Sequence, residues 1–127
     1  MPLPAEQTPL EGERPIPLAW RPAIQAICQS LVDGDYTLRS GIPGVVPLSD
    51  EEAAQTRDYI QDYGETLVSL PEETWDSSVC SWQGKGRWDA IVDLWTQAEG
   101  RSDLVLHLFV SEVEGGFEFR VHMVYVP

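Results

Sequence analysis

Residues 87–126 read RWDAIVDLWTQAEGRSDLVLHLFVSEVEGGFEFRVHMVYV, and this stretch decides the fold. Apolar side chains recur at every second position in three runs: Trp88, Ala90, Val92 and Leu94; Leu104, Leu106, Leu108 and Val110; Phe117, Phe119, Val121, Met123 and Tyr125. A period of two is typical of strands that bury one face and leave the other mixed. The stretch therefore predicts a C-terminal meander of three antiparallel strands.

The last turn of this meander is predicted at Gly115 and Gly116, because glycine tolerates the positive φ angles of tight hairpin turns. Such a turn pairs Glu114 with Phe117 and sets the apolar positions of the two strands opposite each other. In the first hairpin, around residues 98–101, the same argument places Leu94 opposite Leu104. A fourth, shorter strand over about 79–83 would precede the meander through the glycines at 84 and 86.

Two helices are predicted upstream of the sheet. Trp20-Arg21-Pro22 begins the first, with proline in the first turn where its missing N–H is tolerated, and Asp33-Gly34-Asp35 ends it. Ser49 and Glu52 form a capping box for the second, which Gly64 stops. We expect an α+β fold with both helices packed on one face of an antiparallel sheet of about four strands.

The chain length suits one domain with a substantial core. Half of the ten prolines lie in residues 1–17, which we expect to be extended or mobile, so the single domain is predicted to span 18–127. Cys28 and Cys80 are far apart in sequence and lack the paired spacing of a zinc site or disulfide framework. We expect both to be buried free thiols.

The formal charge of −13 disfavours binding to phosphate backbones, so nucleic acid is not an expected partner. The sequence has neither a signal-peptide pattern nor an apolar run of membrane-spanning length, so we expect a cytoplasmic protein without a membrane partner. The net charge is compatible with a basic protein partner, although acidity alone also serves solubility.

Five phrases carry a family likeness: GIPGVVPLSDEE (41–52), DYGETLVSLPEETWDSSVCSW (62–82), RWDAIVDLW (87–95), RSDLVLHLFV (101–110) and VHMVYVP (121–127). From about Pro15 to its end, the chain resembles a family of small bacterial domains of unknown function. The resemblance implies a bacterial, single-domain protein. It implies no activity, cofactor or catalytic residue.

The mixed face of the predicted sheet is one candidate site. In the register above, His107 and His122 are diagonal neighbours on this face, which Asp89 and Asp93 share. Imidazoles oriented by carboxylates could form an acid–base pair or bind a ligand or metal. Arg87 and Arg120 share the face too, so a cross-strand lattice of ion pairs is the alternative interpretation. No metal or cofactor is predicted outright.

The same mixed face is also a candidate apolar interface, formed by Ile91, Trp95, Val105, Phe109 and Val124. This is more apolar surface than a monomeric protein usually exposes to solvent. The face would then be covered by the amino-terminal segment, by a second copy in a homodimer, or by another partner.

The strongest charge asymmetry lies between Ser49 and Asp76, where nine acidic residues accompany one arginine. Exposed positions of the second helix, Glu51, Asp58, Asp62 and Glu65, would form an acidic stripe. Such a stripe is either a solvated helix face or a docking surface for a basic protein. No catalytic motif occurs in the chain.

We therefore expect a non-catalytic protein-binding module of the immunity or inhibitor type that uses its acidic surface. The alternative is a small-ligand or metal-binding protein, or an enzyme, that uses the face of His107 and His122.

Overall fold

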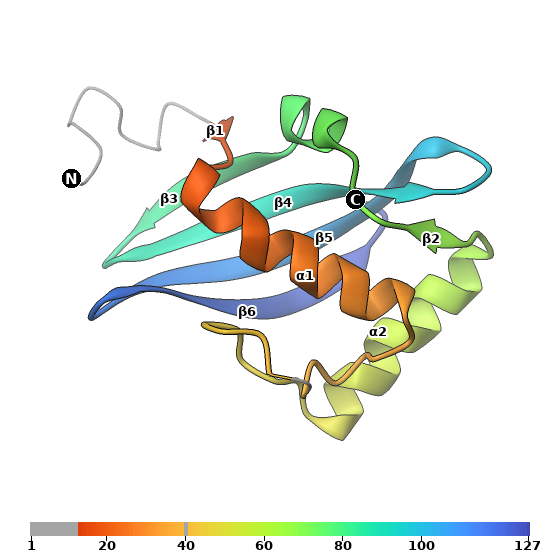
Figure 1. The fold of residues 1–127 in the computed structure, drawn as a ribbon, viewed down its shortest axis with the longest axis horizontal. Helices are drawn as coiled ribbons and strands as arrows, with labels where there is room; N and C mark the ends of the chain where they lie inside the picture. The colour runs from red at the N-terminus through yellow and green to blue at the C-terminus, as the bar shows by residue number, and fades with distance from the viewer. Residues whose placement is uncertain (1–12, 40) are drawn as a thin grey trace.

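The computed structural model describes residues 13–39 and 41–127 and confirms the α+β class. Two helices, α1 (Arg21–Val32) and α2 (Asp50–Tyr63), accompany one six-stranded sheet (Figure 1). The strands are β1 (Arg14–Pro15), β2 (Leu67–Val68), β3 (Val79–Gly84), β4 (Arg87–Thr96), β5 (Gly100–Val113) and β6 (Gly116–Tyr125). Their order is β1-β3-β4-β5-β6, all neighbours are antiparallel, and β2 pairs with the end of β4. The three-strand meander and the predicted fourth strand are confirmed.

Both helices begin and end where the sequence predicts. A short 3-10 helix at Leu18–Trp20 leads into α1, whose first turn holds Pro22. The capping box of α2 is complete, because the Ser49 hydroxyl accepts from the Glu52 amide and the Glu52 carboxylate accepts from the Ser49 amide. Gly64 ends α2 in the left-handed conformation that glycine adopts without strain.

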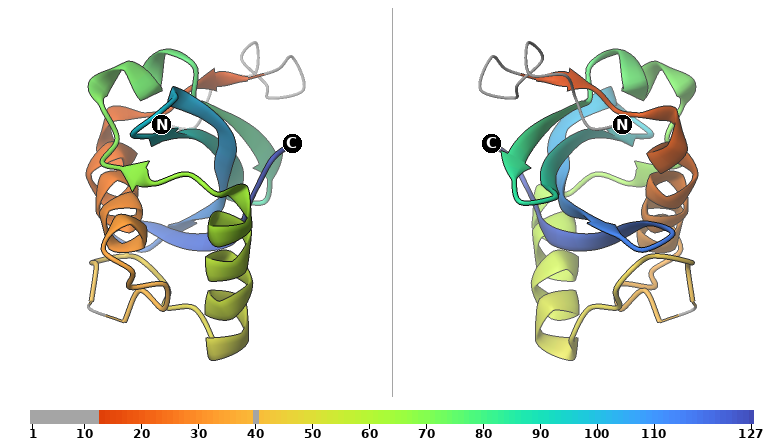
Figure 2. Two further views of the ribbon diagram at one scale, coloured as in Figure 1. Left: turned by 90° about the vertical axis from the view of Figure 1, so that its right-hand side faces the viewer. Right: turned by 90° about the vertical axis from the view of Figure 1, so that its left-hand side faces the viewer.

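The helices take different positions against the sheet. Helix α1 crosses in front of the strands, whereas α2 lies beside the β6 edge (Figures 1 and 2). The buried side of α1 consists of Ile24, Ile27, Cys28 and Leu31. Because α2 buries fewer residues, namely Ala53, Thr56 and Ile60, most of its circumference meets solvent.

The two-residue strands β1 and β2 were not predicted. Backbone pairing of Arg14 with Cys80 adds β1 to the free edge of β3, and Leu67 with Thr96 adds β2 to β4. Ile16, which follows β1, is 1% exposed and belongs to the core. The prediction of an extended or mobile segment over 1–17 lies mostly outside the described residues.

The predicted register of the β4–β5 hairpin is confirmed along most of its length. Asp89 pairs with Phe109, Ile91 with His107 and Asp93 with Val105, which is the alignment that sets Leu94 against Leu104. A register shift follows between Asp93 and Trp95. The alternation of apolar side chains was sufficient here because both strands keep one buried face.

The predicted register of the β5–β6 hairpin is wrong by two residues. Val113 pairs with Gly116, so the loop consists of Glu114 and Gly115, and Glu112 rather than Glu114 pairs with Phe117. Gly115, at φ 86°, supplies the left-handed turn residue while Gly116 already belongs to the strand. A shift of two leaves the apolar faces matched, so side-chain alternation could not detect this error.

A β-bulge in β6 overturns a second part of the prediction. Leu108 pairs with Val121 and His107 with Met123, so His122 is an extra residue in the ladder. The side-chain alternation reverses beyond it, and Val124 faces the core with 1% exposure. The predicted place of Val124 on the mixed face is therefore wrong; Met123 and Tyr125 lie there instead.

The core lies between α1 and the inner face of the sheet. At one end, the Trp20 ring makes edge contacts with Trp88, Phe117 and Phe119 at centroid distances of 5.5 to 6.3 Å. Cys28 and Cys80 are buried and free, as predicted, and burial raises the pKa of their thiols to about 12 and about 11. Among the described residues, no helix is long and apolar enough to cross a membrane.

Candidate functional site

The face of the sheet turned away from α1, here called the outer face, gathers the side chains that the sequence singled out. Neither α1 nor α2 covers it, because α1 packs on the opposite side of the sheet and α2 lies beside β6 (Figure 2). Its residues are Arg87, Asp89, Ile91, Asp93 and Trp95 from β4, Val105, His107 and Phe109 from β5, and Glu118, Arg120, His122, Met123 and Tyr125 from β6.

His107 lies at the centre of the outer face with both ring nitrogens close to protein groups. Its Nε2 is 3.3 Å from Oδ2 of Asp89 but is not aligned for a hydrogen bond. Its Nδ1 is 3.4 Å from the hydroxyl of Tyr125. The His122 ring stands edge-on to it at 4.9 Å. The bulge causes this proximity, because two residues of β6, His122 and Met123, oppose one residue of β5.

Phe109 extends the cluster as the middle layer of a stack. The His122 ring stacks on Phe109 at 4.5 Å, and the Arg87 guanidinium lies 4.0 Å from the Phe109 centroid. Arg87 also pairs with Asp89 at 3.2 Å. Cation–π and ring contacts of this kind each contribute about 0.5 to 1.5 kcal/mol. Of the lattice of ion pairs predicted as the alternative interpretation, the described residues show the Arg87–Asp89 pair within β4 and the His107–Asp89 contact between β4 and β5.

The surroundings of His107 favour its neutral form. Burial lowers the pKa of this imidazole below its usual 6.5, and the cationic forms of His122 and Arg87 act in the same direction. The hydrogen-bonding and charge contributions of Asp89 oppose this shift without cancelling it. Neutral His107 is suited to a structural role between Asp89 and Tyr125.

The four residues of the predicted ligand or metal face do not converge. Asp93 is separate from the imidazoles, because its carboxylate accepts a hydrogen bond from the Ser77 hydroxyl and its amide donates to Ser78. Within residues 13–39 and 41–127 no group of three or more His, Cys, Asp or Glu side chains is arranged to hold a metal ion. A metal at His107 would have to displace Asp89 or Tyr125.

The apolar part of the outer face ranges from half-buried to fully buried. Val105 is 4% exposed, and Ile91, Trp95 and Phe109 are in an intermediate class. The Trp95 indole N–H has no hydrogen-bond partner among the described residues. Met123 and Tyr125 are the outer-face residues that sequence reasoning assigned to the core, since no residue in VHMVY marks the bulge.

A second candidate site, here called the acidic surface, lies on α2 and beyond its carboxyl end. The predicted stripe of Glu51, Asp58, Asp62 and Glu65 is exposed throughout. Its one arginine, Arg57, pairs with Asp58 at 3.1 Å. Sequence reasoning missed that two further acids, Glu99 and Asp103 of the β4–β5 hairpin, lie beside the carboxyl end of α2.

Tyr63, the last residue of α2, makes that connection. Its hydroxyl lies 2.9 Å from both carboxylate oxygens of Glu99 and accepts a hydrogen bond from the Asp103 amide at 3.1 Å. The Asp103 amide lowers the pKa of Tyr63, but burial and the nearby charges of Glu99 and Asp103 outweigh it and leave the pKa raised. Glu99 also accepts from the Thr96 hydroxyl, which orients its carboxylate.

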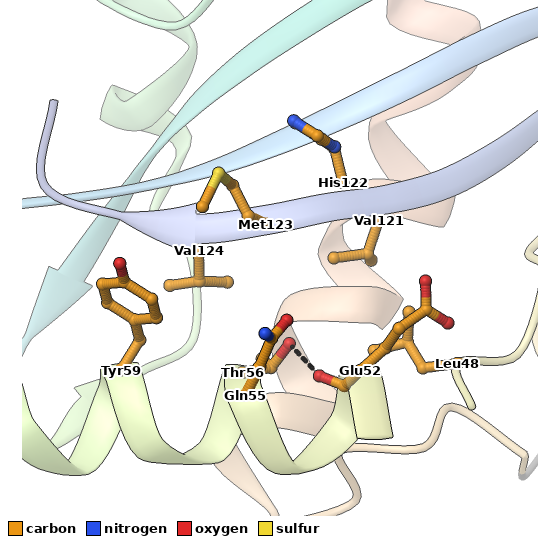
Figure 3. Close-up of a pocket in the computed structure, with 9 residues that line it drawn as sticks. All are labelled: Leu48, Glu52, Gln55, Thr56, Tyr59, Val121, His122, Met123 and Val124. Carbon is orange, nitrogen blue, oxygen red and sulfur yellow. Dashed lines mark hydrogen bonds between the residues drawn. The ribbon is translucent and has the colours of Figure 1, made fainter. Parts of the chain in front are cut away.

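The groove between α2 and β6 is a packing contact and holds room for about 80 Å³ (Figure 3). Val121 and Val124 point toward the helix, whereas His122 and Met123 project from the other side of the strand (Figure 3). Thr56 donates to the Glu52 carbonyl within the helix. The groove therefore shows how the bulge at His122 turns both Val121 and Val124 toward α2. We assign it no ligand.

A protein-family model described as "Domain of unknown function (DUF7668)" matches residues 28–127. No curated protein and no solved structure matches the chain. The matched region begins within α1 and includes the strands from β2 to β6. Both the outer face and the acidic surface therefore lie inside it.

Proposed function

The chain belongs to the DUF7668 family of domains of unknown function, and we propose that it is a non-catalytic, inhibitor-type module that binds a basic protein through its acidic surface. The observation that carries this proposal is the Tyr63 bridge. It connects Glu99 and Asp103, from the end of the β4–β5 hairpin, to the carboxyl end of α2. Two acidic residues from the β4–β5 hairpin thereby lie beside the carboxyl end of the helix that carries the acidic stripe.

The acidic residues at the carboxyl end of α2 destabilise the helix. The carboxyl end of a helix carries a partial negative charge, which favours Lys or Arg nearby and disfavours carboxylates. The last turn of α2 has no basic residue and contains Asp62, and Glu65 follows directly after Gly64. Acids at such a place cost about 0.3 to 1 kcal/mol each, so their presence supports a role outside folding.

The partner implied by this chemistry presents several lysines or arginines. Exposed charges steer encounter and raise association rates, and their effect is screened beyond about 8 to 10 Å at physiological salt. An inhibitor gains from rapid association because it must meet its target before the target acts. The module needs no chemical step: occupying the basic surface of the partner is sufficient to block it.

The test combines capture and kinetics. The full chain and a variant with Glu51, Asp58 and Asp62 all changed to Lys would be used in parallel to capture proteins from the source organism. A partner retained by the original chain alone would be purified, and its association rate measured across salt concentrations. We expect the triple variant to associate at least roughly tenfold more slowly at low salt, with dissociation changed less.

A matched control carries the same charge change elsewhere. Glu72, Glu73 and Asp76 are exposed near the start of α1, so replacing these three by Lys changes the net charge equally without touching α2. The control should retain most of the association rate. If both triple variants slow association equally, net charge rather than the acidic surface is responsible, and the proposal fails.

A further inference from the structure

The outer face is nearly balanced in charge, unlike the rest of the molecule. Arg87 and Arg120 offset all but one of the carboxylates of Asp89, Asp93 and Glu118, whereas the whole chain carries −13. Two copies of so acidic a protein repel each other across most orientations. The outer face is a surface through which they could approach at little electrostatic cost.

The carboxylates at the centre of this face already have partners within the chain. Asp89 pairs with Arg87 at 3.2 Å, and the Asp93 carboxylate accepts a hydrogen bond from Ser77. Burial costs less for a charge that is paired or hydrogen-bonded than for an isolated one. The side chains around them, including Phe109, Tyr125, Met123 and Trp95, are of the types enriched in interface cores.

The rim of the face along β6 carries opposite charges in alternation. Glu118 and Arg120 are both exposed and point to the outer face two residues apart. A two-fold axis between them would set Glu118 of each copy against Arg120 of the other. This is the reciprocal pairing that an isologous interface requires.

We propose that the outer face is the interface of a homodimer, in which two copies bury their clusters around His107 and Phe109 and pair Glu118 with Arg120 across a two-fold axis. The interface is distinct from the acidic surface, so each copy would still present that surface to another protein.

The first experiment measures the mass of the full chain by sedimentation velocity from about 1 to about 100 µM, the range in which a micromolar dimer dissociates. We expect a dimer at the upper end. Its affinity should rise with salt, because salt screens the repulsion between two chains of −13. A complex formed through the acidic surface should instead weaken as the salt concentration rises. The two proposals can therefore be tested independently.

Variants locate the interface. Met123→Glu places a charge within the outer face and should weaken association at least roughly tenfold, because like or unpaired charges in an interface oppose binding. Leu18→Glu is the matched control, since Leu18 is 75% exposed in the short helix before α1. It should leave the dimer unchanged.

A charge swap tests the two-fold pairing. Arg120→Glu alone should weaken the dimer, whereas the double variant Glu118→Arg with Arg120→Glu should restore it. A monomer at about 100 µM in high salt would overturn the proposal. So would a dimer that Met123→Glu leaves intact, or a failure of the double variant to rescue. Protection of the outer face from modification in a strictly monomeric sample would assign the face to a different occupant.

Discussion

The two faces of the meander are built from the same strands but are held together by different physics. Inward from β4, β5 and β6 lie aliphatic and aromatic side chains packed against α1, several of them fully buried. Outward lie His107, which is half-buried, the exposed His122 and the carboxylates and rings beside them, which touch through specific pairs at 3.2 to 4.9 Å. The inner face is stabilised by apolar burial, which does not require any particular pair of side chains to meet. The stability of the outer face depends on specific pairs of side chains being in contact.

This difference explains why the inner face tolerates an irregular strand. The bulge at His122 exchanges Met123 for Val124 at the core, and both positions still satisfy the requirement for an apolar side chain. On the outer face the same bulge decides which groups meet, because it brings the His122 ring next to His107. The bulge at His122 therefore changes the packing of the inner face little, whereas it determines which side chains are in contact on the outer face.

The largest expected effect lies on the inner face. Leu106→Ala should lower the free energy of unfolding by about 2 to 5 kcal/mol, because the side chain is fully buried and its removal leaves a cavity. Arg120→Ala, an exposed outer-face change, should stay within about 0.5 kcal/mol. Urea unfolding of both variants measures the contrast. Similar losses at the two sites would contradict the assignment of the faces.

The bulge itself is tested by neighbouring residues of β6. Val124→Ala should cost about 1 to 3 kcal/mol because Val124 is in the core, whereas Met123→Ala should cost about 1 kcal/mol or less because Met123 is half-buried outside it. A regular strand in the register predicted from sequence reverses this order. Denaturant unfolding of the two variants distinguishes the alternatives.

The pH dependence of stability sharpens the description of the outer face. His107 has a lowered pKa in the folded chain and titrates near 6.5 when unfolded. Between the two pKa values the unfolded state therefore binds more protons than the folded state. The contribution of His107 to the free energy of unfolding is complete above pH 6.5 and is lost as the pH falls through the folded-state pKa. Comparing unfolding free energies at several pH values between the original chain and His107→Gln should isolate this loss. An equal pH dependence in both proteins would rule out His107 as its source.

The smallest expected effect is that of added metal. Zinc should leave the melting temperature unchanged, because both nitrogens of His107 face protein groups and Asp93 is held by Ser77. Calorimetric titration would complement the thermal measurement. Saturable binding tighter than micromolar that disappears in both His107→Ala and His122→Ala would contradict this expectation and restore the ligand or metal hypothesis.

Sequence reasoning reached the fold wherever a local signal existed. The capping box of Ser49 and Glu52, the stop at Gly64 and the alternation in β4 and β5 are confirmed because capping, turn chemistry and pleat are properties of neighbouring residues. The candidate sites were predicted less completely. Asp89, His107 and His122 were correctly placed on one face, whereas Asp93 shares the face but belongs to a separate hydrogen-bond network.

The sequence by itself determined two helices, their ends, the antiparallel meander and its apolar inner face, since each depends on short-range periodicity and on the limited backbone freedom of a few residues. Tertiary structure alone decided the turn at Glu114 and Gly115, the bulge at His122, and the Tyr63 contacts with Glu99 and Asp103. The reason is that a two-residue register shift preserves side-chain alternation, and that a hydrogen bond between residues 36 to 40 positions apart leaves no periodic trace in the chain.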